Sequence, residues 1–155
     1  MGLYDRYLLP HLIDFACGMG EVMKARSQLV PQAHGRVLEI GIGSGLNLAF
    51  YDAEKVSVII GVDPSADMQK LAKQRAAAIS IPVEMIALEL GQIRAEDASF
   101  DCIVCTFTLC TIPDAVTALK EMRRVLKPGG RLLFCEHGMA PELPVLRWQN
   151  RLTPL

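Results

Sequence analysis

The chain has no long apolar run, no excess of one charge and no even set of cysteines. No run approaches the roughly 18 residues that a membrane-spanning helix needs, and residues 1–6 lack the apolar core of a signal peptide. Lysine and arginine are scattered and the formal net charge is -1, which argues against a nucleic-acid partner. The five cysteines are an odd number, and four of them lie in apolar, strand-like or strand-adjacent segments. We therefore expect reduced thiols, no transmembrane segment and a cytoplasmic location.

Two of the cysteines, Cys102 and Cys105, have the C-x-x-C spacing of many metal and redox sites. In a strand, however, side chains three residues apart point to opposite faces of the sheet. No second pair of cysteines or histidines is placed to complete a tetrahedral site. We therefore expect no bound metal.

The length of 155 residues corresponds to one domain, and no internal repeat, low-complexity tract or linker divides it. Apolar strand-like runs alternate with helix-like segments, which is typical of a parallel sheet with helices on both faces. The sequence therefore predicts an α/β, doubly wound and mainly parallel fold. Within it we expect an N-terminal helical cap (1–34), a core (35–138) and a tail (139–155).

The expected strands cover about 36–41, 57–62, 83–87, 100–106 and 131–136. An apolar stripe at helical spacing over 4–28 predicts an N-terminal helix, interrupted near Gly18 and Gly20. Further helices are expected after Gly45, from Asp63 to Ile79 and from Pro113 to Leu126. The last of these carries an apolar stripe that we expect to be buried, formed by Val116, Leu119, Met122 and Leu126.

The most informative segment is 37–45, a short apolar run followed by glycine at every second position. Its glycines, Gly41, Gly43 and Gly45, permit a turn whose backbone approaches a ligand closely. The spacing differs from the G-x-G-x-x-G fingerprint of dinucleotide sites, because Leu46 takes the place of the last glycine. The first turn of the helix expected after Gly45 would face a polar or anionic ligand group with free amides.

A carboxylate, Asp63, follows Gly41 by about twenty residues at the end of a second apolar run. There it could accept both hydroxyls of a ribose. The sequence Asp-Pro-Ser that begins at Asp63 also suits a helix cap, and the two roles can coexist. Together with the glycine turn, this acid predicts a nucleoside ligand.

In this order the motifs resemble those of the class I S-adenosylmethionine-dependent methyltransferases. The resemblance covers about residues 35–138 and rests on four segments, 37–45, 61–65, 99–101 and 124–130. Within that class, the segments 104–111, 134–137 and 147–155 are most similar to the thiol methyltransferase group and its bacterial relatives. More distant similarity extends to quinone C-methyltransferases and phospholipid N-methyltransferases. The resemblance implies a Rossmann-like fold with S-adenosylmethionine as cofactor.

Carried over by position, the resemblance assigns each part of the cofactor to residues of this chain. Glu39 and the backbone of the three glycines would hold the methionine end, and Asp63 the ribose hydroxyls. Pro64 and Met68 would pack near the adenine, and Thr106 would line the path of methyl transfer. Glu89 would accept the adenine amino group, although Leu88 stands before it where a glycine is common and a solvated loop acid is the alternative.

The resemblance implies methyl transfer to a small-molecule acceptor, with a thiol as one option. His137 is the nearby group whose ordinary pKa suits deprotonation of a thiol, while a structural or solvent-facing histidine is the alternative. A quinone ring carbon or a lipid amine could equally be the acceptor. A nicotinamide-dependent oxidoreductase and a cofactor-binding domain without turnover remain as further alternatives.

In the class I fold an antiparallel strand pair follows the fifth strand, and this sequence does not contain it. The resemblance therefore implies that strand 131–136 is an apolar edge with unpaired backbone groups. We expect this edge to be covered either by a second copy of the chain or by residues 139–155. A homodimer is the favoured option, because the three prolines of the tail disfavour a regular covering strand.

Overall fold

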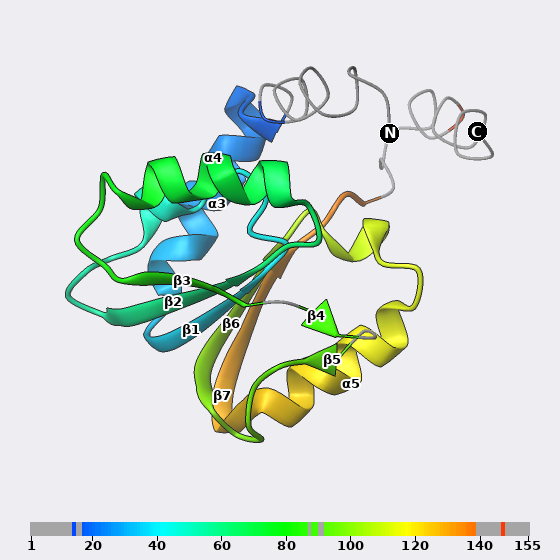
Figure 1. Cartoon of the computed structure of the whole chain (residues 1–155). Helices are drawn as coiled ribbons and strands as arrows, with labels where there is room; N and C mark the ends of the chain where they lie inside the picture. Colours follow the sequence, from blue (N-terminus) through cyan, green and yellow to red (C-terminus); the bar gives the residue numbers. More distant parts are fainter. Residues whose placement is uncertain (1–13, 15–16, 87, 90–91, 139–146, 148–155) are drawn as a thin grey trace.

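The computed structural model describes residues 14, 17–86, 88–89, 92–138 and 147, and its centre is a five-stranded sheet (Figure 1). The strands are β1 Gly35–Ile40, β2 Val56–Val62, β3 Val83–Ile86, β6 Phe100–Thr106 and β7 Leu126–Cys135. Their order is β3-β2-β1-β6-β7, and every neighbouring pair is parallel. Since β1 lies in the middle with β2 and β6 beside it, the chain reverses its direction of winding at β1. The α/β, doubly wound prediction is confirmed.

Each face of the sheet is covered by its own set of elements (Figure 1). On one face lie helix α3 (Gly20–Leu29), the 3-10 helix η1 (Val30–Gln32) and helix α4 (Ala66–Ala76). On the other lie helix α5 (Ala115–Val125) and the small antiparallel pair of β4 (Leu88–Glu89) and β5 (Gln92–Ile93). Cys102 belongs to the first core and Cys105 to the second, as the alternation of a strand predicts.

Side-chain caps fix the starts of the two long helices that follow β2 and β6. The Ser65 hydroxyl accepts a hydrogen bond from the Met68 amide at 3.3 Å and caps α4. The Asp114 carboxylate accepts one from the Thr117 amide at 2.9 Å and caps α5. The cap of α4 is therefore Ser65 rather than Asp63, which leaves the Asp63 carboxylate at the end of β2.

Two sequence expectations are wrong. No α-helix follows Gly45: the chain turns there and forms only the 3-10 helix η2 (Leu48–Phe50) before β2 begins. Too few residues separate the glycine turn from β2 for a full helix, and Leu48 and Tyr51 are needed in the core. The stripe expected to be buried in the helix from Pro113 to Leu126 is also wrong, because Val116 is 63% and Leu119 40% exposed and Leu126 is the first residue of β7.

The buried stripe of α5 instead runs along Ala118, Met122 and Val125. These positions are spaced by four and three residues, so they lie on one face of the helix. This face differs from the one that Val116 and Leu119 predicted. Helix α5 is therefore rotated about its axis relative to the sequence expectation, and the small side chain of Ala118 faces the sheet.

The N-terminal helix is interrupted at Gly18 and Met19 before α3 begins, as predicted. Strand β7 lies at one end of the described sheet, and Phe134 on it is 58% exposed. The predictions for residues 1–13 and for the tail lie outside the described residues. Among the helices that the structure describes, none has the length and apolar character that a bilayer crossing requires.

Candidate functional site

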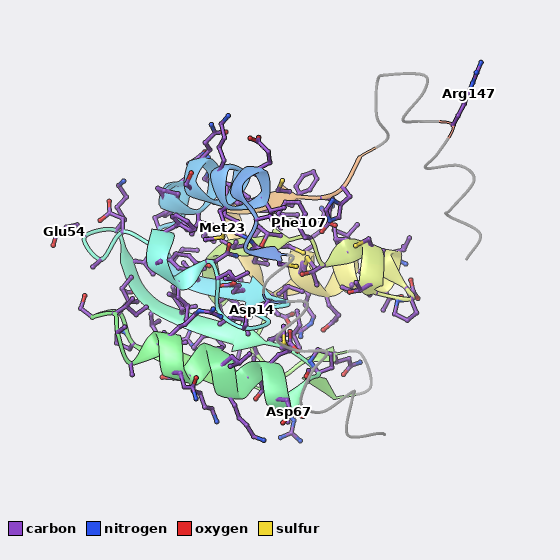
Figure 2. The ribbon with its side chains drawn as sticks, turned by 90° about the horizontal axis from the view of Figure 1, so that it is seen from above. Asp14, Met23, Glu54, Asp67, Phe107 and Arg147 are labelled. Atoms are coloured by element: carbon purple, nitrogen blue, oxygen red, sulfur yellow. The ribbon has the colours of Figure 1, made fainter. Side chains whose placement is uncertain are left out.

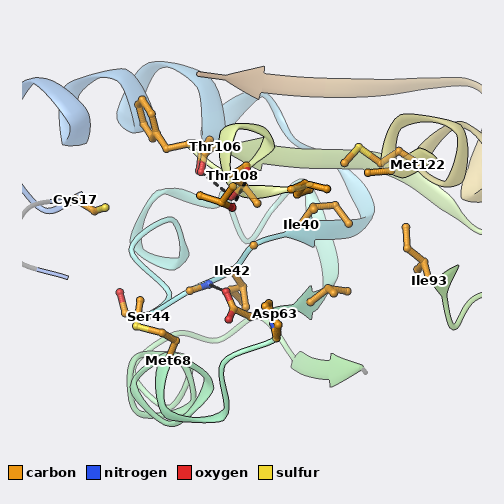
Figure 3. A pocket seen from close by; sticks show the side chains of 18 of the residues that line it. Cys17, Ile40, Ile42, Ser44, Asp63, Met68, Ile93, Thr106, Thr108 and Met122 are labelled. Carbon is orange, nitrogen blue, oxygen red and sulfur yellow. Dashed lines mark hydrogen bonds between the residues drawn. The ribbon is translucent and has the colours of Figure 1, made fainter. Parts of the chain in front are cut away.

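A cavity of about 700 Å³ lies at the carboxyl ends of β1, β2 and β6. This is the edge at which open α/β sheets bind their ligands. In Figure 3, Ser44, Asp63 and Met68 lie across from Thr106 and Thr108, with Ile93 and Met122 farther along. Apolar side chains make up much of the wall, among them Ile40, Ile42, Val62, Met68, Ile93, Ile112 and Met122.

The glycine turn forms one wall of the cavity and has the left-handed backbone that favours glycine. Gly41 has φ of +69° and Gly43 φ of +56°. A Cβ on Gly41 would collide with the Thr108 side chain, whereas beside Gly43 the nearest atom would be Met68 Cε at 3.6 Å. Gly45 does not line the cavity, because it packs against Leu48 and Ala72. The first two glycines therefore bring the backbone close to the cavity and the third supports the turn.

Four amides of this turn have acceptors within the protein. Gly41 N and Ile42 N donate to the carbonyl oxygen of Val62, at 2.8 and 3.1 Å. Gly45 N donates to Ile42 O at 2.9 Å, and Gly43 N donates to Asp63 Oδ2 at 2.9 Å. These four amides are therefore not free to donate to a ligand, and the glycines contribute a close approach of the backbone.

Asp63 joins the end of β2 to the glycine turn. Its Oδ2 accepts from Gly43 N, and its Oδ1 accepts from Ser65 N at 2.8 Å. A carboxylate has about four lone-pair positions, so it can still accept two hydroxyl groups. Asp63 lines the cavity, and its neighbours Pro64 and Met68 line it as well. The site thus has an acceptor for a diol beside an apolar surface.

Behind the glycine turn lies a buried polar network centred on Glu39, which is 1% exposed. Glu39 Oε2 accepts from the Tyr51 hydroxyl at 2.8 Å, and Oε1 accepts from Asn47 Nδ2 at 2.9 Å. Burial raises the pKa of Glu39 to about 7, although these two hydrogen bonds and the charge of Arg26 oppose the shift. Glu39 therefore keeps its proton to a higher pH than an ordinary glutamate does.

The network reaches the cavity through Arg26 and Thr106, which both line it. Arg26 is 7% exposed, and its Nη1 donates to Asn47 Oδ1 at 2.8 Å and to Thr106 Oγ1 at 2.7 Å. Thr106 Oγ1 also accepts from Asn47 Nδ2 at 3.0 Å. Burial lowers the pKa of Arg26, and the nearby Glu39 opposes this shift. Sequence reasoning missed Arg26, because it comes from a helix with no recognisable motif.

The loop after β6 is held by a second carboxylate, that of the half-buried Glu136. Its Oε1 accepts from both Thr108 N and Leu109 N at 2.8 Å. Just before them, Phe107 has a φ of +55°, which is strained for a residue with a large side chain. The Phe107 ring lines the cavity and lies 5.1 Å from the Arg26 guanidinium carbon. Glu136 therefore positions a strained part of the cavity wall.

The far N-terminal part of the described chain reaches the same site through Asp14. Arg75 on α4 binds both Asp14 oxygens, at 2.8 and 2.9 Å, and also donates to Ser44 O at 2.7 Å. Ser44 Oγ donates to the same carboxylate at 2.5 Å. Figure 2 shows Asp14 in the middle of the molecule as seen from above, with Glu54 and Asp67 at its outline. Asp14 thus borders the cavity and links the segment before α3 to the glycine turn.

The cavity brings together most of the residues that the sequence indicated. Those that line it are Gly41, Gly43, Asp63, Pro64, Met68 and Thr106. The Glu39 side chain lies behind the wall rather than in it, and the Glu89 side chain lies outside the described part. His137 is exposed and is not among the lining residues. Its ring centroid lies 4.8 Å from that of Phe107, which does line the cavity.

Comparison with known proteins assigns this chain to a protein family. The family model described as methyltransferase domain matches residues 38–134. Thiol S-methyltransferase TMT1B of Rattus norvegicus is 37% identical over 123 residues, which are 76% of this chain and 49% of that protein. Ubiquinone/menaquinone biosynthesis C-methyltransferase UbiE of Geotalea daltonii is 39% identical over 108 residues, which are 66% and 46% of the two chains. The chain therefore spans about half the length of these relatives.

Similarity to solved structures agrees with this result. The crystal structure of the YcgJ protein of Bacillus subtilis matches with a TM-score of 0.67 and 31% identity. The match covers 84% of this chain and 56% of the other. The matched family segment 38–134 contains the end of β1, all of β2 and β6 and the glycine turn, so it includes most of the cavity described above. The chain belongs to the methyltransferase domain family.

Proposed function

We propose that this chain binds S-adenosylmethionine and transfers its methyl group to a small-molecule acceptor. The observation that carries the proposal is the joining of Asp63 to the glycine turn, with Gly43 N bonded to Asp63 Oδ2, at the wall of a ligand-sized cavity. The Asp63 carboxylate suits the ribose hydroxyls, and the adjoining surface of Pro64 and Met68 suits the flat, apolar adenine. Membership of the methyltransferase domain family supports this cofactor.

The contribution of the protein is to bind, align and exclude water. The sulfonium methyl group of the cofactor is already a strong electrophile, so few reactive side chains are required. Gly41 and Gly43 let the backbone approach the ligand, and Asp63 fixes the sugar. Glu136 holds the loop of Phe107 and Thr108 in place, which sets the position of the opposite wall. Alignment of this kind is where most of the rate enhancement would arise.

A thiol is the acceptor that we favour, because the thiol S-methyltransferase relative is similar over three quarters of the chain. A small apolar thiol also suits the wall formed by Ile93, Ile112 and Met122. His137 would serve as the base, acting from beside Phe107 at the edge of the cavity. A quinone ring carbon is the second acceptor, on the similarity to UbiE, and a lipid amine is the third.

The test is a methylation assay on the full 155-residue chain with S-adenosylmethionine labelled in its methyl group. Small thiols, quinols and lipid amines are offered in turn, and the labelled product is counted. We expect product from thiols above the level of the Asp63→Ala variant. Calorimetric titration with the cofactor and with NAD runs beside it. Cofactor binding without product from any acceptor would leave a binding domain without turnover, and preference for NAD would contradict the proposal.

A further inference from the structure

Arg26 is the only cationic side chain among the described residues that line the cavity. The other charged groups on this wall are carboxylates, those of Asp14, Asp63, Asp114 and Glu121. Two of these carboxylates are already ion-paired, Asp14 with Arg75 and Glu121 with Arg124. An anionic group of a ligand therefore meets a cation of the described lining at one place. That place lies beside Thr106, across the cavity from Asp63 (Figure 3).

The hydrogen bonds of Arg26 leave part of its guanidinium without a partner. Both bonds that Arg26 makes to described residues come from Nη1 and go to neutral oxygens, those of Asn47 and Thr106. Its Nε is buried with no acceptor in the described part of the chain. A buried cation whose donors are only partly used is costly unless a further acceptor arrives.

Thr106 adds another donor at the same place. Its hydroxyl oxygen already accepts two hydrogen bonds, from Arg26 Nη1 and from Asn47 Nδ2. A hydroxyl has two acceptor lone pairs, so both are occupied and its own proton remains to be donated. Both Asn47 amide protons are also used, one on Thr106 and one on Glu39. The cluster thus offers donors to the cavity, and a ligand group that only accepts would fit it.

The charge of the cluster points in the same direction. Glu39 is the nearest acid to Arg26 in this network, but it contacts Arg26 only through Asn47. Because burial raises the pKa of Glu39, its negative charge is less complete at neutral pH than that of an ordinary glutamate. Arg26 therefore carries a positive charge that its protein neighbours neutralise only in part, and a bound anion would complete the pairing.

Four amides of the glycine turn do not compete for this anion. Amides at Gly41, Ile42, Gly43 and Gly45 all have acceptors within the protein, and the expected helix N-terminus after Gly45 does not form. We propose that Arg26, with the Thr106 hydroxyl, binds the carboxylate of the amino-acid end of the cofactor. This inference rests on the proposed function, since a ribose held at Asp63 directs the amino-acid chain across the glycine turn toward Thr106.

The experiment compares two ligands by isothermal titration calorimetry on the full chain. One is S-adenosylhomocysteine, and the other is the same molecule with its carboxylate replaced by hydrogen and its amine kept. We expect the intact protein to bind the first ligand roughly 10- to 100-fold more tightly, as a charge-assisted hydrogen-bonded pair requires. In Arg26→Gln this preference should fall to less than about threefold, through loss of affinity for S-adenosylhomocysteine alone.

Two further variants complete the test. Arg26→Lys keeps the charge and loses the planar fork, so we expect it to restore part of the preference. Lys24→Gln removes an exposed cation from the same helix and should change neither affinity. Circular dichroism checks that each variant is folded. If Arg26→Gln does not fold, the preference of the intact protein between the two ligands still decides.

Different failures have different meanings. A folded intact protein that binds neither ligand would contradict the proposed function itself. Equal binding of both ligands by the intact protein would overturn the role of Arg26 while leaving cofactor binding in place. The role of Arg26 would also be overturned if Arg26→Gln weakened both ligands by one factor, because Arg26 would then act only by supporting Asn47 and Thr106.

Discussion

Replacing Glu39 by glutamine should change how the stability of the protein depends on pH. Glu39 is buried, and its pKa is raised from 4.5 to about 7 by desolvation. In the unfolded chain the pKa returns to its ordinary value. The native state therefore holds a proton that the unfolded state has already released between these two pH values. By linkage, the free energy of unfolding must fall as the pH rises across this interval.

The structure gives the size of the effect. One pKa unit corresponds to about 1.4 kcal/mol, so the shift of Glu39 costs about 3 kcal/mol once the pH is above 7. The contribution is fully present below pH 4.5 and is lost as the pH passes about 7. Glu39→Gln copies the protonated form, because the Tyr51 hydroxyl can turn to accept from the new amide while Asn47 still donates. The variant removes the titration and keeps the shape.

Urea unfolding of both proteins between pH 5 and pH 8 is the measurement. We expect the intact protein to lose most of this contribution, about 2–3 kcal/mol, relative to Glu39→Gln over this range. The carboxylates with lowered pKa values, such as Asp101 and Glu121, titrate below this window and are common to both proteins. Parallel profiles, or a relative gain by the intact protein with rising pH, would refute the reasoning.

Three further predictions concern the site and the sheet edge. Asp63→Ala should weaken S-adenosylhomocysteine binding by about 1–3 kcal/mol, and Gly43→Val should weaken it too, because a φ of +56° disfavours a residue with a side chain. An unchanged affinity of both variants in calorimetric titration would contradict the ribose site at Asp63. His137→Ala should slow methylation of a weakly acidic thiol more than that of an acidic one, so equal losses in the rate assay would exclude a base role. Phe134→Glu should lower any concentration-dependent mass seen by light scattering, since Phe134 is exposed on the end strand β7; a strict monomer at all concentrations would contradict a homodimer.

The sequence predicted the sheet well because its central strands are buried on both faces. Such strands need continuous apolar runs, and those of β1, β2 and β6 stand out from the polar segments around them. The glycine turn and Asp63 were also visible, since local backbone demands and a strand end fix both of them. Their bond between Gly43 N and Asp63 Oδ2 confirms that the two motifs lie together.

Features that depend on long-range packing were not visible. The orientation of α5 is set by Ala118 facing the sheet, which size and hydrophobicity alone do not indicate. The network of Glu39, Asn47 and Arg26 joins residues from three separate segments. The motif 37–45 indicated Glu39, but Asn47 and Arg26 carry no local signature. From sequence, Arg26 cannot be distinguished from an ordinary surface arginine of an amphipathic helix. Its contact with Thr106 at the end of β6 depends on the packing of α3 against the sheet.

The hydrogen bonds of Arg26 should also extend the cooperative folding unit beyond the segment matched by the family. They connect α3, which precedes the matched segment 38–134, to Asn47 and Thr106 within it. A fragment starting at Gly35 would bury the side-chain oxygen Oδ1 of Asn47 without its donor, Arg26. Leaving a buried acceptor without a donor costs about 1–3 kcal/mol. Helix α3 should therefore unfold together with the sheet, and its amides should exchange with solvent as slowly as those of β1. We therefore expect the unit that folds to be larger than the matched segment 38–134.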